Sequence, residues 1–213
     1  MDLLDVVLHL DVHLIRMVET YGIWVYGILF AIIFSETGFV VTPFLPGDSL
    51  LFVAGAIAAT GSLSVHVLFV VLTIAAILGN TANYAIGRWM GQYFFRDGDS
   101  RWLNPRHLEK AHAFYERHGG SAVVISRFLP IVRTYVPFVA GMAAMKPREF
   151  TMYNVAGALL WCGGLTYAGY FFGNIPWIRD NLTAMIIGIV VLSLLPLLYA
   201  FARSRLKRRG AKP

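Results

Sequence analysis

The pattern of apolar and polar positions divides the chain into continuous apolar segments and interrupted ones. The continuous segments are residues 65–87, 149–175 and 181–202, which together contain a single charged residue, Glu149. A helix that crosses a bilayer core about 30 Å thick needs about 20 predominantly apolar residues. The pattern therefore predicts three helices that span a membrane.

Two further apolar segments, residues 23–60 and 121–146, are interrupted by prolines, glycines and charged residues. In the first, the apolar run before Glu36 has 13 residues, which makes a helix of about 20 Å, too short to span. In the second, Arg127 and Arg133 flank a proline. Each segment therefore predicts a re-entrant hairpin, in which two half-membrane helices meet at a broken tip. Such backbone is tolerated only where protein or a water-filled cavity surrounds it.

Two flanking segments have amphipathic patterns. Residues 1–22 carry an apolar stripe at helical spacing, which predicts a helix lying along a membrane surface. Residues 92–120 contain a helix start at Asn104 and a stop at Gly119, which predicts a second surface helix. Residues 203–213 form a basic tail without acidic residues.

Composition and charge agree with a membrane protein and give it an orientation. Hydrophobic residues make up 57% of the chain and charged residues 14%, whereas soluble domains average about 25% charged residues. Lys and Arg mark the cytoplasmic side. With the tail 203–213 in the cytoplasm, 14 of the 18 basic residues fall inside, two outside and two within the membrane. The N-terminus is therefore predicted outside and the C-terminus inside, and the net charge of +6 reflects this asymmetry rather than nucleic-acid binding.

The chain also contains an internal repeat. The heptapeptide FVAGAIA at Phe52 recurs as FVAGMAA at Phe138, and the spacing Gly87-x-x-x-Gly91 recurs as Gly169-x-x-x-Gly173. Each half would hold one hairpin and one spanning helix, and the two hairpins would open to opposite sides. The predicted fold is therefore one all-α integral membrane domain: an inverted repeat of hairpin plus spanning helix, a further C-terminal spanning helix and amphipathic interfacial helices. This architecture is typical of secondary transporters.

Four charged side chains lie within the predicted hairpins: Glu36, Asp48, Arg127 and Arg133. Each costs about 2.5–3.5 kcal/mol at the centre of a membrane helix, so the four must face one another or a water-filled cavity. One interpretation is structural, with two acids and two arginines forming salt bridges that clamp the hairpins together. Asp48 could also serve only as the N-cap of the helix that follows it.

The other interpretation is an anion site. The guanidinium fork matches phosphate oxygens, so Arg127 and Arg133 are the candidates for binding a phosphate. Glu36 and Asp48 would pair with the arginines in the empty site and carry the coupling proton. Helix N-termini at Ser49 and near Tyr135 would add backbone donors. The further polar residues that could line the cavity are Thr134, Asn80, Asn83 and Asn154.

Other kinds of chemistry are not expected. Cys162 is the only cysteine, which excludes an intrachain disulfide and a cysteine metal cluster. His9 and His13 share a helix face with Asp5, a pattern that seldom marks a metal site on an exposed helix. A lipid phosphatase would need a nucleophile and histidines beside its basic cluster, and the membrane segment around Arg127 and Arg133 contains no histidine. The sequence therefore predicts a protein that is not an enzyme and has no cofactor or metal.

Several stretches form a long and specific pattern. They are GNTANYAIGRWMG, FYERHGG, RFLPIVRTYVPFVAGMAAMKPREFTMYNVAGALLW and the segment from Glu36 to Pro46-Gly47-Asp48. In these stretches the chain resembles the DedA family of membrane proteins, also described as SNARE-associated or VTT-domain proteins. The resemblance covers roughly residues 10–175. Asn83 is a small departure, because it stands where many relatives are expected to have glycine.

The resemblance implies a transporter of polyprenyl phosphate, chiefly undecaprenyl phosphate, that returns this carrier lipid to the cytoplasmic leaflet of the bacterial inner membrane. It also implies dependence on the proton gradient, with Glu36, Asp48, Arg127 and Arg133 as the essential residues. Some relatives are better described as scramblases, and a proton- or ion-coupled transporter of a small soluble anion is the rival interpretation. The expected partners are the lipid substrate and membrane lipids. The oligomeric state stays open, with a homodimer among the alternatives.

Overall fold

The computed structural model describes residues 16–18, 20–38, 47–95, 120–129, 132–175 and 188, and these residues contain helices but no strand. Two helices are long: α5 (Val65–Phe95) and α9 (Pro147–Gly173). Each contains a 27-residue stretch that is long and apolar enough to cross a membrane. The predicted all-helical membrane fold with long apolar helices is therefore confirmed at this level.

Four helices are shorter. They are α3 (Trp24–Gly38), α4 (Gly47–Ala59), α7 (Ser121–Ser126) and α8 (Val132–Met142). The 15 residues of α3 and the 13 residues of α4 correspond to about 22 Å and about 20 Å, less than the thickness of a bilayer core.

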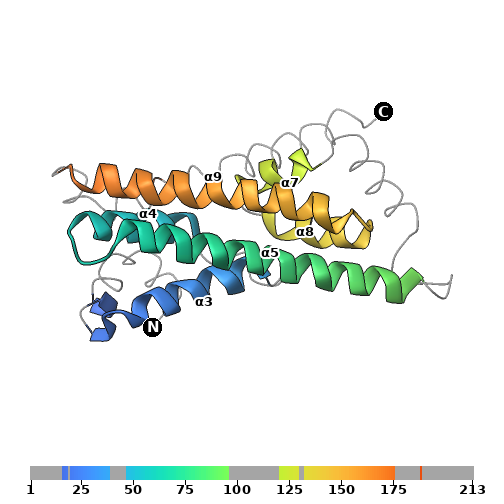
Figure 1. Ribbon diagram of the computed structural model, residues 1–213, viewed down its shortest axis with the longest axis horizontal. Coiled ribbons are helices and arrows are strands. Elements are labelled where there is room, and N and C mark those ends of the chain that lie inside the picture. Colours follow the sequence, from blue (N-terminus) through green and yellow to red (C-terminus); the bar gives the residue numbers. More distant parts are fainter. Residues whose placement is uncertain are drawn as a thin grey trace, which may run out of the picture.

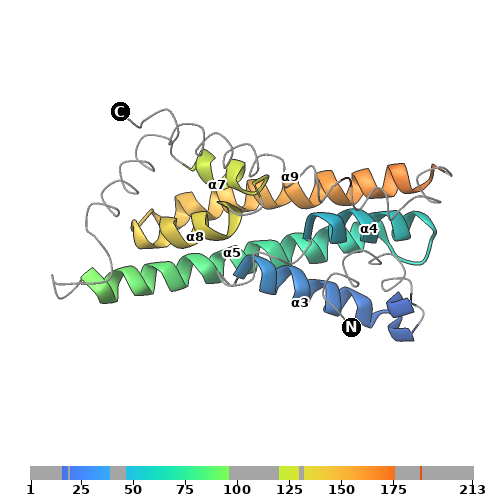
Figure 2. The same ribbon diagram turned by 180° about the vertical axis from the view of Figure 1, so that it is seen from behind.

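The short helices run to and from the interior of an elongated molecule (Figures 1 and 2). Helix α3 starts at one end and reaches the middle, and α4 starts in the interior and returns to the same end. Helix α8 starts near the middle and leads to the opposite end, where α9 begins. This arrangement suits the predicted pair of opposed hairpins, but their position in a membrane stays a prediction.

One predicted boundary differs from the structure. Helix α5 ends at Phe95 rather than at residue 87, so the first residues of the predicted surface segment 92–120 belong to α5. The physical reason is that residue 87 is the end of the uncharged run before Arg88, whereas the helix itself continues into more polar sequence. Gly87 faces α8, where an added Cβ would clash with the carbonyl oxygen of Phe138.

Four predicted features lie outside the described residues. They are most of the 1–22 helix, the hairpin tip at 39–46, the 96–119 part of the surface segment, and the last spanning helix with the tail, apart from Gly188.

Two helix pairs are packed backbone to backbone, and they use the repeated sequences in the same way. Helix α4 packs along α9, and α8 packs along α5. An added Cβ on Gly169 would clash with the carbonyl oxygen of Phe52, just as one on Gly87 would clash with that of Phe138. Phe52 and Phe138 begin the two copies of the repeated heptapeptide. The repeat therefore encodes one contact made twice, each time between the short helix of one half and the long helix of the other.

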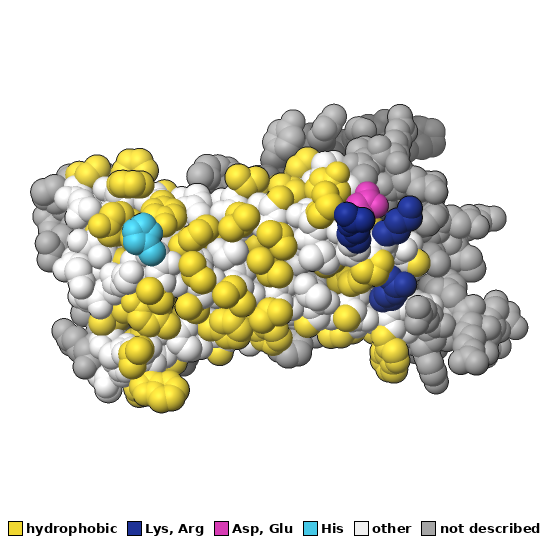
Figure 3. All heavy atoms as spheres, in the orientation of Figure 1, with side chains coloured by type: hydrophobic (Ala, Val, Ile, Leu, Met, Phe, Trp, Pro, Cys, Tyr) yellow, Lys and Arg dark blue, Asp and Glu magenta, His cyan; other side chains and the backbone are white. Residues whose placement is uncertain are grey.

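The outer surface separates apolar and basic side chains. Hydrophobic side chains spread over the middle of the face shown in Figure 3, and Lys and Arg side chains gather at the end where α9 begins. Lys146 and Arg148, which flank the start of α9, are exposed. Large apolar side chains such as Ile74, Leu78 and Leu160 are also exposed, on α5 and α9. An apolar flank of this kind suits contact with lipid.

Candidate functional site

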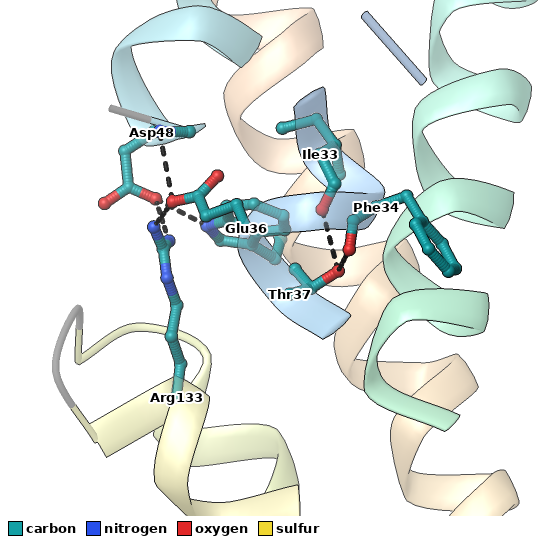
Figure 4. A network of polar contacts seen from close by, with 8 residues as sticks. Ile33, Phe34, Glu36, Thr37, Asp48 and Arg133 are labelled. Atoms are coloured by element: carbon teal, nitrogen blue, oxygen red, sulfur yellow. Dashed lines mark hydrogen bonds and ion pairs between the residues drawn. The ribbon is translucent and has the colours of Figure 1, made fainter. Parts of the chain in front are cut away.

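Arg133 lies between two carboxylates at the centre of the candidate site (Figure 4). One amino group of its guanidinium donates to Glu36 Oε1, and the other donates to Asp48 Oδ1 at 2.7 Å. Glu36 is fully buried, and Arg133 is 6% exposed. Removing one member of such a buried pair leaves an uncompensated charge, which typically costs about 3–5 kcal/mol.

The three charges come from the inner ends of three short helices. Glu36 lies in the last turn of α3, Asp48 in the first turn of α4, and Arg133 in the first turn of α8. Residues far apart in the chain therefore meet where these helices end. The backbone N–H of Gly47 also donates to Glu36 Oε1, at 3.2 Å. A Cβ on residue 47 would overlap the Glu36 carboxylate, so any other residue there would displace that carboxylate.

Trp161 on α9 completes this cluster. Its indole Nε1–H donates to Asp48 Oδ1 at 2.9 Å, and its ring centroid is 5.0 Å from Cζ of Arg133, within cation–π range. Trp161 is 2% exposed. Sequence analysis did not assign it to the site, although an indole N–H in the middle of an apolar span was the available signal, because a buried one normally finds an acceptor.

Arg127 forms a second, separate cluster. Its Nη2 donates to Asn154 Oδ1 at 2.6 Å and to the carbonyl oxygen of Ala76 at 3.2 Å, and its Nε has no hydrogen-bond partner. The side chain is buried, with 2% of the residue exposed. Among the described residues no carboxylate pairs with it. The prediction that both arginines rest on the two acids is therefore correct for Arg133 and wrong for Arg127.

Asparagines on α5 and α9 link these elements. Asn154 Nδ2 donates to the carbonyl oxygen of Ile77 at 3.1 Å and to Thr81 Oγ1 at 3.2 Å, and its Oδ1 accepts from Asn80 at 3.2 Å. Asn83 Nδ2 donates to the carbonyl oxygens of Thr37 and Thr134, at 3.4 and 2.8 Å. Asn154 thus contacts Arg127 directly and Asn80 bonds to Asn154, whereas Asn83 joins the end of α3 to the start of α8.

Comparison with known proteins identifies the family of this chain. The VTT domain matches residues 45–171, a range that includes Asp48, Arg127 and Arg133. Protein DedA of Escherichia coli K12 is 54% identical over 213 residues, which cover 99% of this chain and 97% of that protein. The chain belongs to the DedA family of VTT-domain membrane proteins.

Less similar relatives of this chain are membrane proteins by name. An uncharacterized membrane protein of Mycobacterium leprae is 42% identical over 169 residues, which cover 79% of this chain and 76% of that protein. The inner membrane protein YghB of E. coli K12 is 37% identical over 157 residues, which cover 74% of this chain and 72% of that protein. No solved structure matches this chain.

The remaining candidate site residues of this DedA-family chain differ in burial. Ser49 and Thr134 are each 1% exposed and follow Asp48 and Arg133 in the chain. Tyr135 is 46% exposed, which keeps its side chain out of the buried cluster. It was predicted from its place near a helix N-terminus, but α8 directs its side chain away from the buried face that holds Arg133.

The charges balance over the site but not within each cluster. Two carboxylates share Arg133, whereas Arg127 has only neutral oxygen acceptors. With both acids ionised, one cluster carries an excess negative charge and the other an excess positive charge. Such an arrangement can accept an anion at the arginines and a proton at the carboxylates.

Proposed function

We propose that this DedA-family protein transports polyprenyl phosphate, with undecaprenyl phosphate as the expected species, between the leaflets of the bacterial inner membrane. Transport is coupled to the proton gradient, and the protein is a transporter rather than an enzyme. The observation that carries the proposal is the buried Glu36–Arg133–Asp48 triad, placed where the inner ends of α3, α4 and α8 meet. Ionisable residues inside membrane segments are costly and usually mark a transport path.

The chemistry of the triad suits a phosphate monoester. Arginine binds phosphate through two parallel N–H donors, and Arg133 already uses two of its nitrogens on Glu36 and Asp48. An arriving phosphate would replace these carboxylates as the acceptor. A proton taken up by a displaced carboxylate would keep the site near neutrality, and its loss would let the carboxylate compete for Arg133 again and release the lipid.

Glu36 is the better placed carrier of this proton. Its Oε1 accepts from Arg133 and Gly47, while its Oε2 is buried without a hydrogen-bond partner. A protonated carboxyl group would hold its proton on this second oxygen and leave the bonds of Oε1 intact. Asp48, by contrast, has 19% of its side chain exposed.

The surroundings of the site favour a lipid over a water-soluble substrate. Large apolar side chains cover the outer faces of α5 and α9, so an isoprenoid tail could remain in the bilayer while its phosphate enters. Glu36 and Arg133 are buried, so the helices must separate before a phosphate can reach Arg133. Short helices that open toward opposite sides would expose the site to each leaflet in turn, with the N-terminus outside and the C-terminus in the cytoplasm.

Two other functions use the same charges. A transporter of a small soluble anion would bind inorganic phosphate at least as tightly as undecaprenyl phosphate. Its site would need no opening toward the bilayer. A general scramblase would move phospholipids without regard to headgroup and without a proton gradient. Binding and transport assays that include these substrates separate the three functions.

The decisive test is Arg133→Lys in purified protein. Lysine keeps the positive charge but loses the two-pronged fork, so affinity for undecaprenyl phosphate should fall by about 1–3 kcal/mol while the protein still folds. Binding is measured with undecaprenyl phosphate, a polyprenol of the same length and inorganic phosphate. Arg133→Gln serves as the comparison that removes the charge. Parental lipid binding by Arg133→Lys, together with failure of Arg133→Gln to fold, would make the triad a structural clamp.

A further inference from the structure

We propose that Asn154 is a positioning residue that keeps Arg127 charged, uncompensated and aimed at the incoming anion, so that Arg127 makes the first contact with the phosphate. This inference rests on the proposed function and assigns different roles to the two arginines. In it, Arg127 receives the phosphate first, and Arg133 binds it afterwards, when Arg133 releases the carboxylates that carry the proton.

The two arginines differ in what they must give up to bind an anion. Arg133 is bonded to two carboxylates and lies against Trp161, so a phosphate must break strong charge-assisted bonds to reach it. Arg127 is bonded to an amide oxygen and a backbone carbonyl oxygen, both neutral. A phosphate that replaces these acceptors is attracted to the guanidinium by its opposite charge. No anionic group has to leave Arg127 to make room for it.

Arg127 also has a donor to spare. Its Nε is buried and without a partner, although a buried donor left unpaired costs free energy. A phosphate oxygen bound there would remove that cost. The ligand class that fits is a phosphate group with at least one negative charge, from a lipid headgroup or from free phosphate.

Asn154 is fixed so that its oxygen, and not its nitrogen, faces Arg127. Its Nδ2 is bonded to two acceptors on α5, the carbonyl oxygen of Ile77 and Thr81 Oγ1. Its Oδ1 is thereby directed at the guanidinium, where Asn80 also donates to it. The amide thus holds the guanidinium in place without neutralising it, which a carboxylate at the same position would do.

A glycine on the same helix makes room for the arginine. Gly157 lies about one turn after Asn154 on α9, and a Cβ added there would be 2.9 Å from Cδ of Arg127 and 3.3 Å from Cα of Val124. Alanine at this position would push the arginine side chain without changing any charge. Gly164, also on α9, has no atom within 4 Å of an added Cβ and is the matched control.

The test compares Asn154→Asp with Asn154→Leu, because both variants lose the two amide donors and differ in the charge they present to Arg127. The carboxylate becomes a permanent internal anion. We therefore expect Asn154→Asp to unfold at a higher temperature than Asn154→Leu and yet to bind undecaprenyl phosphate about ten- to a hundredfold more weakly than the parent, and more weakly than Asn154→Leu. A purely structural role would instead make lipid affinity follow thermal stability, and that result would overturn the inference.

Gly157→Ala provides the second readout. We expect Gly157→Ala to weaken lipid binding by about tenfold, because its methyl group shifts the guanidinium of Arg127. Gly164→Ala should bind the lipid with the affinity of the parent, because its methyl group meets no other atom. Parental affinity in Gly157→Ala would contradict the placement of Arg127 in the binding site. Inorganic phosphate and a polyprenol, used in parallel, distinguish a free anion from a lipid headgroup as the ligand. If the parent binds no phosphate lipid, the proposed function itself fails, whereas the stability order of the two Asn154 variants still tests the contact with Arg127.

Discussion

At the scale of single residues, the two arginines of the site have partners of different charge. Arg133 lies between both acids, whereas Arg127 is bonded to neutral oxygens. The partner of Arg127 is Asn154, 27 residues away on another helix. No rule of charge balance predicts a neutral amide as the partner of a guanidinium, because amides are equally at home in bonds between helices.

Glu36→Gln tests the role of the acid in proton coupling. The amide oxygen can take over the bonds that Glu36 Oε1 accepts from Arg133 and Gly47, and the NH₂ group would occupy the place of the unpartnered Oε2. We therefore expect folded protein that binds undecaprenyl phosphate but whose transport into vesicles no longer responds to an imposed proton gradient.

Glu36→Ala is the comparison, because it leaves the Arg133 charge with one carboxylate and opens a cavity. We expect it to lower the melting temperature well below that of Glu36→Gln. Transport by Glu36→Gln that still follows the proton gradient would remove Glu36 from the coupling mechanism.

At the scale of the elements, small residues decide which helices touch. The repeated heptapeptides and glycine pairs were visible in the sequence, but their offsets of 86 and 82 residues did not reveal that each copy packs against the other half. Which half each copy packs against is decided by the tertiary structure, because the residues in contact are far apart in the sequence. Gly169 lies against the backbone of Phe52, and Gly87 lies against the backbone of Phe138, which leaves no room for a side chain in either interface.

Gly87→Ala and Gly169→Ala should therefore destabilise the protein to a similar extent. In each case the new methyl group meets backbone rather than a flexible side chain, and such overpacking typically costs about 1–3 kcal/mol. Thermal unfolding in detergent measures the effect. Gly164→Ala is the control, since its methyl group meets nothing and alanine favours the helix by up to about 1 kcal/mol. Wild-type stability for either interface variant would mean that the two helix pairs are not close-packed in solution.

At the scale of the whole molecule, the apolar runs predicted the long helices and the interrupted segments. They could do so because the bilayer thickness sets how many continuous apolar residues a spanning helix needs. The extension of α5 to Phe95 does not follow from the apolar run, because that run ends before Arg88 whereas the helix continues beyond it. The side of the membrane follows from charge alone. Lys146 and Arg148 lie at the end where α9 begins, and this end is predicted to face the cytoplasm.

Labelling of single cysteines tests this orientation and the first hairpin together. Neither α3, with 15 residues, nor α4, with 13, is long enough to cross a bilayer core, so both ends of the pair should face the same side. In a Cys162→Ala background, we expect a membrane-impermeant maleimide to label Ile23→Cys and Ser62→Cys in intact cells. Lys146→Cys should be labelled only after permeabilisation, and all three positions are exposed. Labelling of residues 23 and 62 from opposite sides would mean that α3 and α4 together cross the membrane, and the opposed-hairpin architecture would be wrong.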